Sequence, residues 1–298
     1  MGGGPLVRHA ALNRLKAILV ALMLSAGALA AGEAATVDET PNADMAIAFA
    51  REVDRKLDVP AEEQIGYAER LQEALSCAGV SDLASQYVVM VDRSPAVQAA
   101  FIYWRSLRGN WHFIGASSVS TGKPGAYEHF LTPLGVFEHS LSNMDFRAEG
   151  TRNQLGIRGY GVAGKRVFDF GWVIAERGWG PPGRSAMRLQ MHATDPDVLE
   201  PRLGEARSEG CIRIPAKLDD FIDRYGLLDA DYERAVAQGR YLWVLRPDRR
   251  PTPWPGRYLV VIDSGRTTRP EWSPGPAKRV WEFPESGCQE GDTGGRPS

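Results

Sequence analysis

The sequence predicts a mainly β domain that follows an N-terminal helical pair and carries short helices after a Gly-Cys motif. From residue 87 the chain alternates short runs of β-branched and aromatic residues with glycine-rich turns, a pattern typical of strands. Two segments rich in helix-forming residues come before these runs, and apolar residues recur at helical spacing within 216–225. The 298 residues, 43% of them hydrophobic, leave room for one large domain or one domain with additions.

The first thirty residues (1–30) are expected to be a signal peptide. Basic residues precede the apolar run 17–24, and the first acidic residue is Glu33, as in a secretory signal. The apolar stretch is shorter than the roughly 20 residues that a helix needs to span a bilayer. We therefore expect cleavage after Ala30 and no stable membrane span in the exported protein, with an uncleaved anchor as the alternative.

Residues 31–85 are expected to form the helical pair, with helices over 44–57 and 60–77. Pro60 suits a first helical turn, and Gly79 suits the end of a helix. The second helix has one apolar face, so we expect the pair to pack on the main domain.

Six strands are predicted in the main domain, over 87–91, 99–104, 111–119, 136–139, 167–174 and 187–192. The turn at 108–110 predicts a hairpin between the second and third of them. The loop 177–183 is rich in glycine and proline and is expected to rim a substrate groove. Pro215 suits the start of a helix that Gly226 ends.

Residues 249–298 are predicted to be a Pro/Arg-rich C-terminal extension that is partly disordered. Within this extension, 258–262 is β-branched and apolar enough for one edge strand. The residues 285–298 have the composition of a disordered tail.

The motif Ser208-Glu209-Gly210-Cys211-Ile212-Arg213 carries the chemistry, together with His192 nineteen positions before the cysteine. An acyl-transferring cysteine needs a nearby imidazole or cation to lower the pKa of its thiol. Cys211 is thus the expected nucleophile and His192 its general base, although each alone has a structural reading as a buried residue. Gly210, with Ser208 in the same loop, is expected to bring backbone N–H groups toward a developing oxyanion.

A second block lies upstream, in Ser120-Thr121-Gly122-Lys123-Pro124 and Thr132-Pro133-Leu134-Gly135-Val136-Phe137. Its glycines and prolines predict turns that shape a groove without reacting. With His192 and Cys211, these motifs resemble the L,D-transpeptidase catalytic domain, or YkuD family, over about residues 86–248. The resemblance implies a YkuD-like β-sandwich.

The resemblance also implies an exported, periplasmic cysteine acyltransferase that acts on peptidoglycan stem peptides. Cys211 would attack the carbonyl of the third residue of a tetrapeptide stem and expel the terminal D-alanine, and an amine acceptor would take the acyl group from the thioester. The acceptor would be a second stem peptide or a wall-anchored protein, and no cofactor or metal is implied. The alternatives are hydrolysis, by an L,D-carboxypeptidase or amidase, and a catalytically decayed wall-binding protein.

Three further residues near the motif are candidate substrate-binding residues: Arg213, Glu209 and Thr194. Arg213 is expected either to clamp a substrate carboxylate or to fix the loop through a salt bridge. Glu209 stands where the family has a histidine, and His192-Ala193-Thr194 stands where it has His-Gly-Thr. Four alternatives are open for Glu209. Unpaired beside the sulfur, its carboxylate would oppose thiolate formation; otherwise it would pair with a nearby cation, bind a cationic acceptor amine, or simply point into solvent.

The composition excludes several partner classes. A net charge of −2 makes nucleic acid an unexpected partner. His112, His129 and His139 lack the close spacing of metal ligands, so we expect structural roles for them.

The chain has three cysteines. Export would allow a disulfide between Cys77 and Cys288, and three independent thiols are the alternative.

Overall fold

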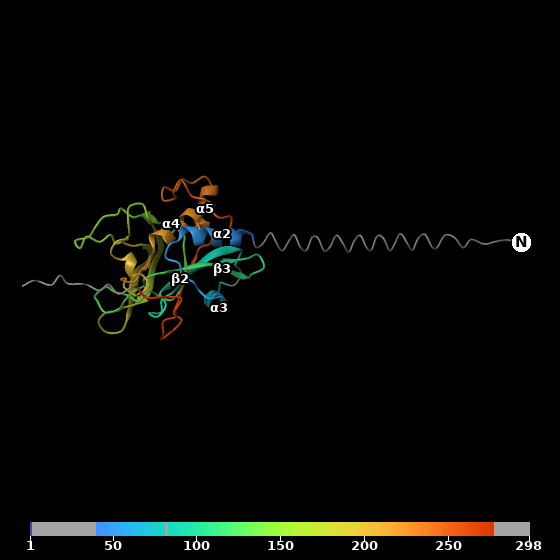
Figure 1. Cartoon of the computed structure of the whole chain (residues 1–298). Helices are drawn as coiled ribbons and strands as arrows, with labels where there is room; N and C mark the ends of the chain where they lie inside the picture. Colours follow the sequence, from blue (N-terminus) through green and yellow to red (C-terminus); the bar gives the residue numbers. More distant parts are fainter. Residues whose placement is uncertain (2–39, 81–82, 277–298) are drawn as a thin grey trace, which may run out of the picture.

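The computed structural model describes residues 40–80 and 83–276, together with Met1 (Figure 1). The predicted signal peptide, the predicted disordered tail and Cys288 lie outside these residues. What is described is a mixed α/β structure, made mostly of strands in two sheets with helices before and after them. Within the described ranges, no helix is long and apolar enough to cross a membrane.

The two sheets contain all six predicted strands of the main domain. The five-stranded sheet has the order β3-β2-β1-β9-β4 and consists of β1 (Gln86–Asp92), β2 (Ala99–Arg105), β3 (Trp111–Ser118), β4 (Gly135–Glu138) and β9 (Tyr258–Ile262). The four-stranded sheet has the order β5-β6-β7-β8 and consists of β5 (Phe146–Arg147), β6 (Arg166–Glu176), β7 (Arg184–Ala193) and β8 (Ile212–Ile214). β2 and β3 pair antiparallel, which confirms the predicted hairpin.

Strands β1, β2 and β9 of the five-stranded sheet are buried on both faces, and their side chains alternate between two hydrophobic cores. Val89 and Ile102 point into the core between the two sheets, whereas Val88 and Phe101 point into a core on the opposite face. Helix α2 (Thr40–Glu52) packs on the first face and helix α3 (Ala61–Cys77) on the second. Figure 1 shows the two helices on either side of β2 and β3. The predicted helical pair therefore divides between the two faces of one sheet.

The core between the sheets positions the segment that contains Cys211. Met191 of β7 and Ile212 of β8 are fully buried in this core, and Phe221 of helix α4 (Ala216–Tyr225) packs beside them. Helix α4 ends at Gly226, as predicted from the sequence. Gly226 has a left-handed conformation (φ 57°), which is common just after a helix. Helix α5 (Ala230–Ala237) follows α4, in agreement with the predicted short helices after the Gly-Cys motif. The short helix η1 (Glu200–Arg202), before that motif, was not predicted.

The predicted edge strand at 258–262 is instead an internal strand. β9 lies between β1 and β4, parallel to β1 and antiparallel to β4. Leu259, Val260 and Val261 are almost fully buried, and such a continuous apolar run is typical of a strand that is covered on both faces. The edge prediction was wrong because it relied on the Pro- and Arg-rich residues around the strand.

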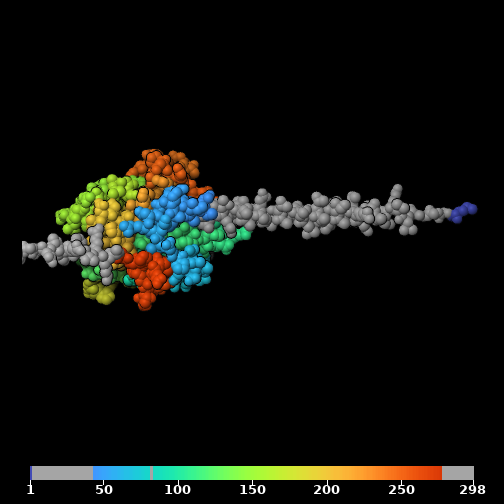
Figure 2. Space-filling model, in the orientation of Figure 1, coloured from blue at the N-terminus to red at the C-terminus, as the bar shows by residue number. Residues whose placement is uncertain are grey.

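The chain after β9 packs against α3. Arg266 forms an ion pair with Glu63, and the ring of Trp272 contacts that of Tyr67 at a centroid distance of 5.9 Å. Figure 2 shows this red C-terminal segment directly beside the blue surface of α3. Residues beyond 248 therefore contribute to both the sheet and its outer core.

Candidate active site

Parallel pairing of β7 and β8 brings the two residues predicted for catalysis onto one surface. His192 lies opposite Arg213 in the register of the two strands. Because side chains alternate along a strand, Cys211 shares a face with Arg213, whereas Ile212 points into the core. Cys211, Arg213 and His192 therefore lie on the outer face of the four-stranded sheet.

His192 is held as a neutral imidazole with its Nε2 available. Its Nδ1 lies 2.6 Å from the carbonyl oxygen of Ala193. A carbonyl only accepts hydrogen bonds, so Nδ1 carries the proton and Nε2 is the basic nitrogen. Nε2 has no hydrogen-bond partner among the described residues. Burial lowers the pKa of His192 to about 4, and the positive charge of Arg213 acts in the same direction.

The Cys211 thiol is protonated at neutral pH. Burial raises its pKa to about 11, although the backbone N–H of Gln190 and the charge of Arg213 oppose this shift. The thiol points to the carbonyl oxygen of Arg188 at 3.6 Å, and no hydrogen bond joins it to His192 in the described structure. The described residues therefore show no contact with an imidazole that would lower this thiol pKa.

The loop before Cys211 is closed by its own side chain. Ser208 Oγ donates a hydrogen bond to the carbonyl of Cys211 and accepts one from the Gly210 N–H at 3.1 Å. Gly210 has φ 135°, and a Cβ there would lie 2.8 Å from Met187 Cε, so this position favours glycine. Because the Gly210 N–H is bonded to Ser208, it is not a free oxyanion donor, and both residues act here in shaping the loop.

The upstream motifs hold this loop from the other side. Ser120 and Arg213 exchange two backbone hydrogen bonds of 2.9 Å. Thr132 Oγ1 accepts a hydrogen bond from the Gly122 N–H and donates one to the carbonyl of Gly210. A Cβ on Gly122 would lie 2.0 Å from the carbonyl oxygen of Phe130, so only glycine fits this close approach. The geometry agrees with motifs that shape the site without reacting.

The structure separates the three candidate substrate-binding residues. Thr194 is fully buried beyond the end of β7, and its hydroxyl has no hydrogen-bond partner among the described residues. Arg213 bonds to the carbonyl of Arg207 at 3.2 Å and forms no ion pair with a described carboxylate. Glu209 is exposed and likewise has no ion-pair partner among the described residues.

A cavity of about 490 Å³ opens beside Cys211. It is lined by Cys211, Glu209, Arg188, Met187, Ala186, Ser185, Trp172, Trp179, Phe130, Glu128 and Tyr127. The rings of Phe130 and Tyr127 pack against Trp179 at centroid distances of 4.8 and 5.7 Å. Trp179 belongs to the loop 177–183, which therefore rims a cavity as predicted. Arg213 and Thr194 do not line it.

A polar network beneath this cavity was missed by the sequence prediction. Asp169 is 1% exposed and accepts hydrogen bonds from Arg188 Nε at 2.7 Å and from Gln190 Nε2 at 2.8 Å. Gln190 Oε1 in turn accepts one from the Tyr160 hydroxyl, and the Tyr160 ring packs on His192. The signal was an aspartate between two phenylalanines in a predicted strand, because a buried aspartate needs partners.

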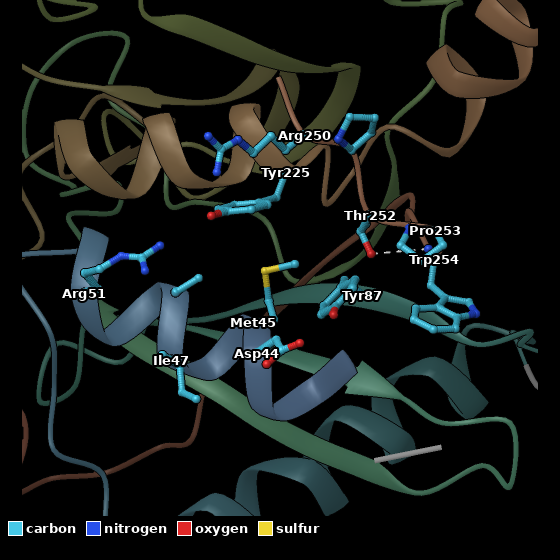
Figure 3. Close-up of a pocket in the computed structure, with 12 residues that line it drawn as sticks. Asp44, Met45, Ile47, Arg51, Tyr87, Tyr225, Arg250, Thr252, Pro253 and Trp254 are labelled. Carbon is cyan, nitrogen blue, oxygen red and sulfur yellow. Dashed lines mark hydrogen bonds between the residues drawn. The ribbon is translucent and has the colours of Figure 1, made fainter. Parts of the chain in front are cut away.

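A second hollow of about 590 Å³ lies elsewhere on the molecule, between α2 and the segment 250–254. Figure 3 shows Met45 and Arg51 of α2 on one side of it and Tyr225 and Arg250 across from them. Neither a cysteine nor a histidine lines this hollow in the described structure. It therefore lacks the cysteine and histidine pair that the sequence motif predicts.

No described group of three or more histidine, cysteine, aspartate or glutamate residues is arranged to hold a metal ion. The chain matches no family model and no curated protein. Its function is therefore inferred from the geometry around Cys211 and from the motifs that hold it.

Proposed function

We propose that the protein is a cysteine acyltransferase of the L,D-transpeptidase type that acts on peptidoglycan stem peptides. The observation that carries this proposal is the placement of Cys211 and His192 on one face of two paired strands, beside a cavity that Cys211 lines. The two upstream motifs support it, because they contact the cysteine loop although they lie about 80 to 90 residues before it.

The proposed reaction uses a protonated thiol and a neutral imidazole. As Cys211 Sγ attacks the substrate carbonyl, His192 Nε2 accepts the thiol proton. The tetrahedral intermediate then collapses to a thioester, and the imidazolium gives its proton to the departing amine. In the second half, His192 takes a proton from the acceptor amine as the amine attacks the thioester. The imidazolium then gives this proton to the departing sulfur, which regenerates the thiol and the neutral imidazole. Arg213 stabilises the developing thiolate through its positive charge.

The resemblance supplies the substrate, and the cavity is compatible with it. Tyr127, Trp172 and Trp179 offer apolar surface to an extended peptide, whereas Glu128 and Glu209 suit a cationic amine. We propose that the donor is a tetrapeptide stem and the acceptor a second stem peptide or a wall-anchored protein. This assignment places the protein in the periplasm.

Muropeptide analysis tests the proposal. Purified protein incubated with tetrapeptide-containing sacculi is expected to yield new crosslinks, and Cys211→Ala is expected to yield none while keeping its thermal unfolding transition. Cys77→Ala is the matched control, because Cys77 is exposed at the end of α3. Tripeptides without crosslinks would instead assign a hydrolase.

Carbapenem labelling separates an enzyme from a wall-binding protein. A carbapenem acylates a working nucleophile, so intact-protein mass spectrometry is expected to show one adduct that maps to Cys211. Retained binding to sacculi without any adduct or product would contradict catalysis and favour the decayed wall-binding protein.

A further inference from the structure

Arg188 is the one cation that lines the cavity beside Cys211 in the described structure. It lies on β7 four residues before His192, on the same outer face of the sheet. Its carbonyl oxygen contacts the thiol of Cys211 at 3.6 Å, so its backbone is fixed relative to the nucleophile. A ligand group bound by Arg188 would therefore lie at a defined distance from the sulfur.

Asp169 fixes the direction of the Arg188 side chain. The Arg188 Nε donates to Asp169 Oδ2 at 2.7 Å, and Asp169 also accepts from Gln190 and from the Gly171 N–H. Asp169 is buried, whereas the Arg188 side chain is 41% exposed. The two terminal nitrogens of Arg188 have no hydrogen-bond partner among the described residues. One edge of the guanidinium is thus anchored and the other faces the cavity.

We infer that Arg188, held by Asp169, is the receptor for a carboxylate of the acyl donor. A guanidinium fork binds a carboxylate through two parallel hydrogen bonds, which a lysine cannot reproduce. Arg213, expected from the sequence as a clamp, does not line this cavity. This inference rests on the proposed function, because it names the substrate group that the same site selects.

The acidic residues of the cavity give this receptor its direction. Glu128 and Glu209 line the cavity together with Arg188. A carboxylate is repelled by the two glutamates and attracted by Arg188, whereas an amine has the opposite preference. The cavity therefore orients a donor that carries both groups, with its carboxylate toward β7.

Paired donor peptides test the inference. The probes are a tetrapeptide and two amides of it, one at the C-terminus and one at the side-chain carboxyl of the third residue. Acylation of Cys211 in the full chain is expected to have a kcat/KM at least about ten-fold higher for the tetrapeptide than for one of the amides, the factor of a charge-assisted hydrogen bond. The amide that loses rate identifies which carboxylate binds.

Variants assign the preference to Arg188. In Arg188→Gln the ratio between acid and amide is expected to fall to near one, and Arg188→Lys should restore only part of it. Asp169→Asn should also lower the ratio, because the amide lacks the charge of the ion pair that holds Arg188. Arg184→Gln is the matched control, since Arg184 is an exposed arginine on the same strand face outside the cavity, and it should keep the wild-type ratio.

Binding measurements separate this inference from the proposed function. The same three peptides are titrated calorimetrically into Cys211→Ala. One outcome is that Cys211→Ala binds the acid more tightly than the amides, that Arg188→Gln removes this preference, and that the wild type is not acylated. This outcome supports the receptor and overturns the proposed function. Acylation without any acid preference overturns the receptor and supports the function. An unchanged ratio in Arg188→Gln also overturns the receptor.

Discussion

Cys211 and His192 are both uncharged in the resting protein, and this sets how the site responds to pH. Burial raises the pKa of Cys211 to about 11 and lowers that of His192 to about 4. A site of this kind differs from a preformed thiolate–imidazolium pair. In the proposed reaction the proton moves only when a substrate carbonyl is attacked, and neutral His192 would be the general base throughout the neutral range.

The acylation rate is therefore expected to be level between pH 6 and 8 and to fall as the pH drops through about 4. The free enzyme loses its base when His192 is protonated, so kcat/KM follows the neutral imidazole. Carbapenem adduct formation, measured by mass spectrometry across this pH range, checks the profile. An acid limb near the ordinary histidine pKa of about 6.5 would show that His192 is not buried during the reaction.

Arg213 is expected to influence both reactive groups in one direction. Its positive charge lowers the pKa of Cys211 and that of His192. Arg213→Gln should consequently raise both pKa values, which slows alkylation of Cys211 by iodoacetamide at pH 8 and moves the acid limb of acylation to higher pH. Arg207→Gln is the control, because the exposed Arg207 side chain pairs with Glu205. Equal profiles for the two variants would argue against this role.

The sequence points to Cys211 and His192 as candidate reacting residues but not to the residues around them. Cys211 and His192 stand out because their residue types and motif point to nucleophilic catalysis. Asp169 and Arg188 carry no such motif, and their pairing arises from the antiparallel register of β6 and β7. Thr194 is fully buried just after β7 and does not line the cavity, and the sequence pattern does not show this burial.

At the scale of elements, the strands were predictable where their apolar runs were bounded by turns. The order of strands was not, because pairing between distant segments depends on tertiary packing. β9 illustrates this limit, since its five residues predict a strand but not its place between β1 and β4. Strands β5 and β8 have only two and three residues, too few to show a period.

The contact between the two upstream motifs and the cysteine loop is expected to be intolerant of a single methyl group. Gly122→Ala would place a Cβ 2.0 Å from the Phe130 carbonyl and 2.9 Å from the Thr132 nitrogen. We expect a loss of at least about 1–3 kcal/mol in unfolding free energy, and slower acylation because the loop at Cys211 moves. Gly159→Ala is the control, since no atom lies within 4 Å of the added carbon. Equal melting temperatures for the two variants would contradict the close approach.

At the scale of the whole molecule, a buried charged cluster joins the four-stranded sheet to the helices after Cys211. Arg166 of β6 is fully buried and binds Asp145, Asp223 and Asp229. Both ring nitrogens of His139 face acceptors, namely Asp145 and the carbonyl of Leu228. Removing one member of such a cluster leaves a buried charge without its partner, so we expect the loss of any one member to destabilise the contact between these segments.

Asp219 of α4 is the member of this region that costs stability. Burial and the charge of Asp223 raise its pKa to about 8, and one of its oxygens has no hydrogen-bond partner among the described residues. The carboxyl is therefore protonated in the folded protein below about pH 8, whereas the unfolded chain ionises near pH 4. Unfolding releases a proton between these values, so stability falls as the pH rises from about 4 to about 8.

Asp219→Asn should remove this pH dependence. The amide keeps an acceptor for the Arg166 N–H, which bonds to Asp219 Oδ1 at 3.2 Å, and it cannot ionise. The measured quantity is the unfolding free energy of the variant minus that of the wild type. This difference should be larger at pH 8 than at pH 4 by on the order of a few kcal/mol, because each unit of pKa difference is worth about 1.4 kcal/mol. Urea unfolding at both pH values measures this difference.

Asp54→Asn, at an exposed position, should show no such gain. If the Asp219→Asn difference were the same at pH 4 and pH 8, the carboxyl would be ionised in the folded protein and its burial would have to be compensated by a partner.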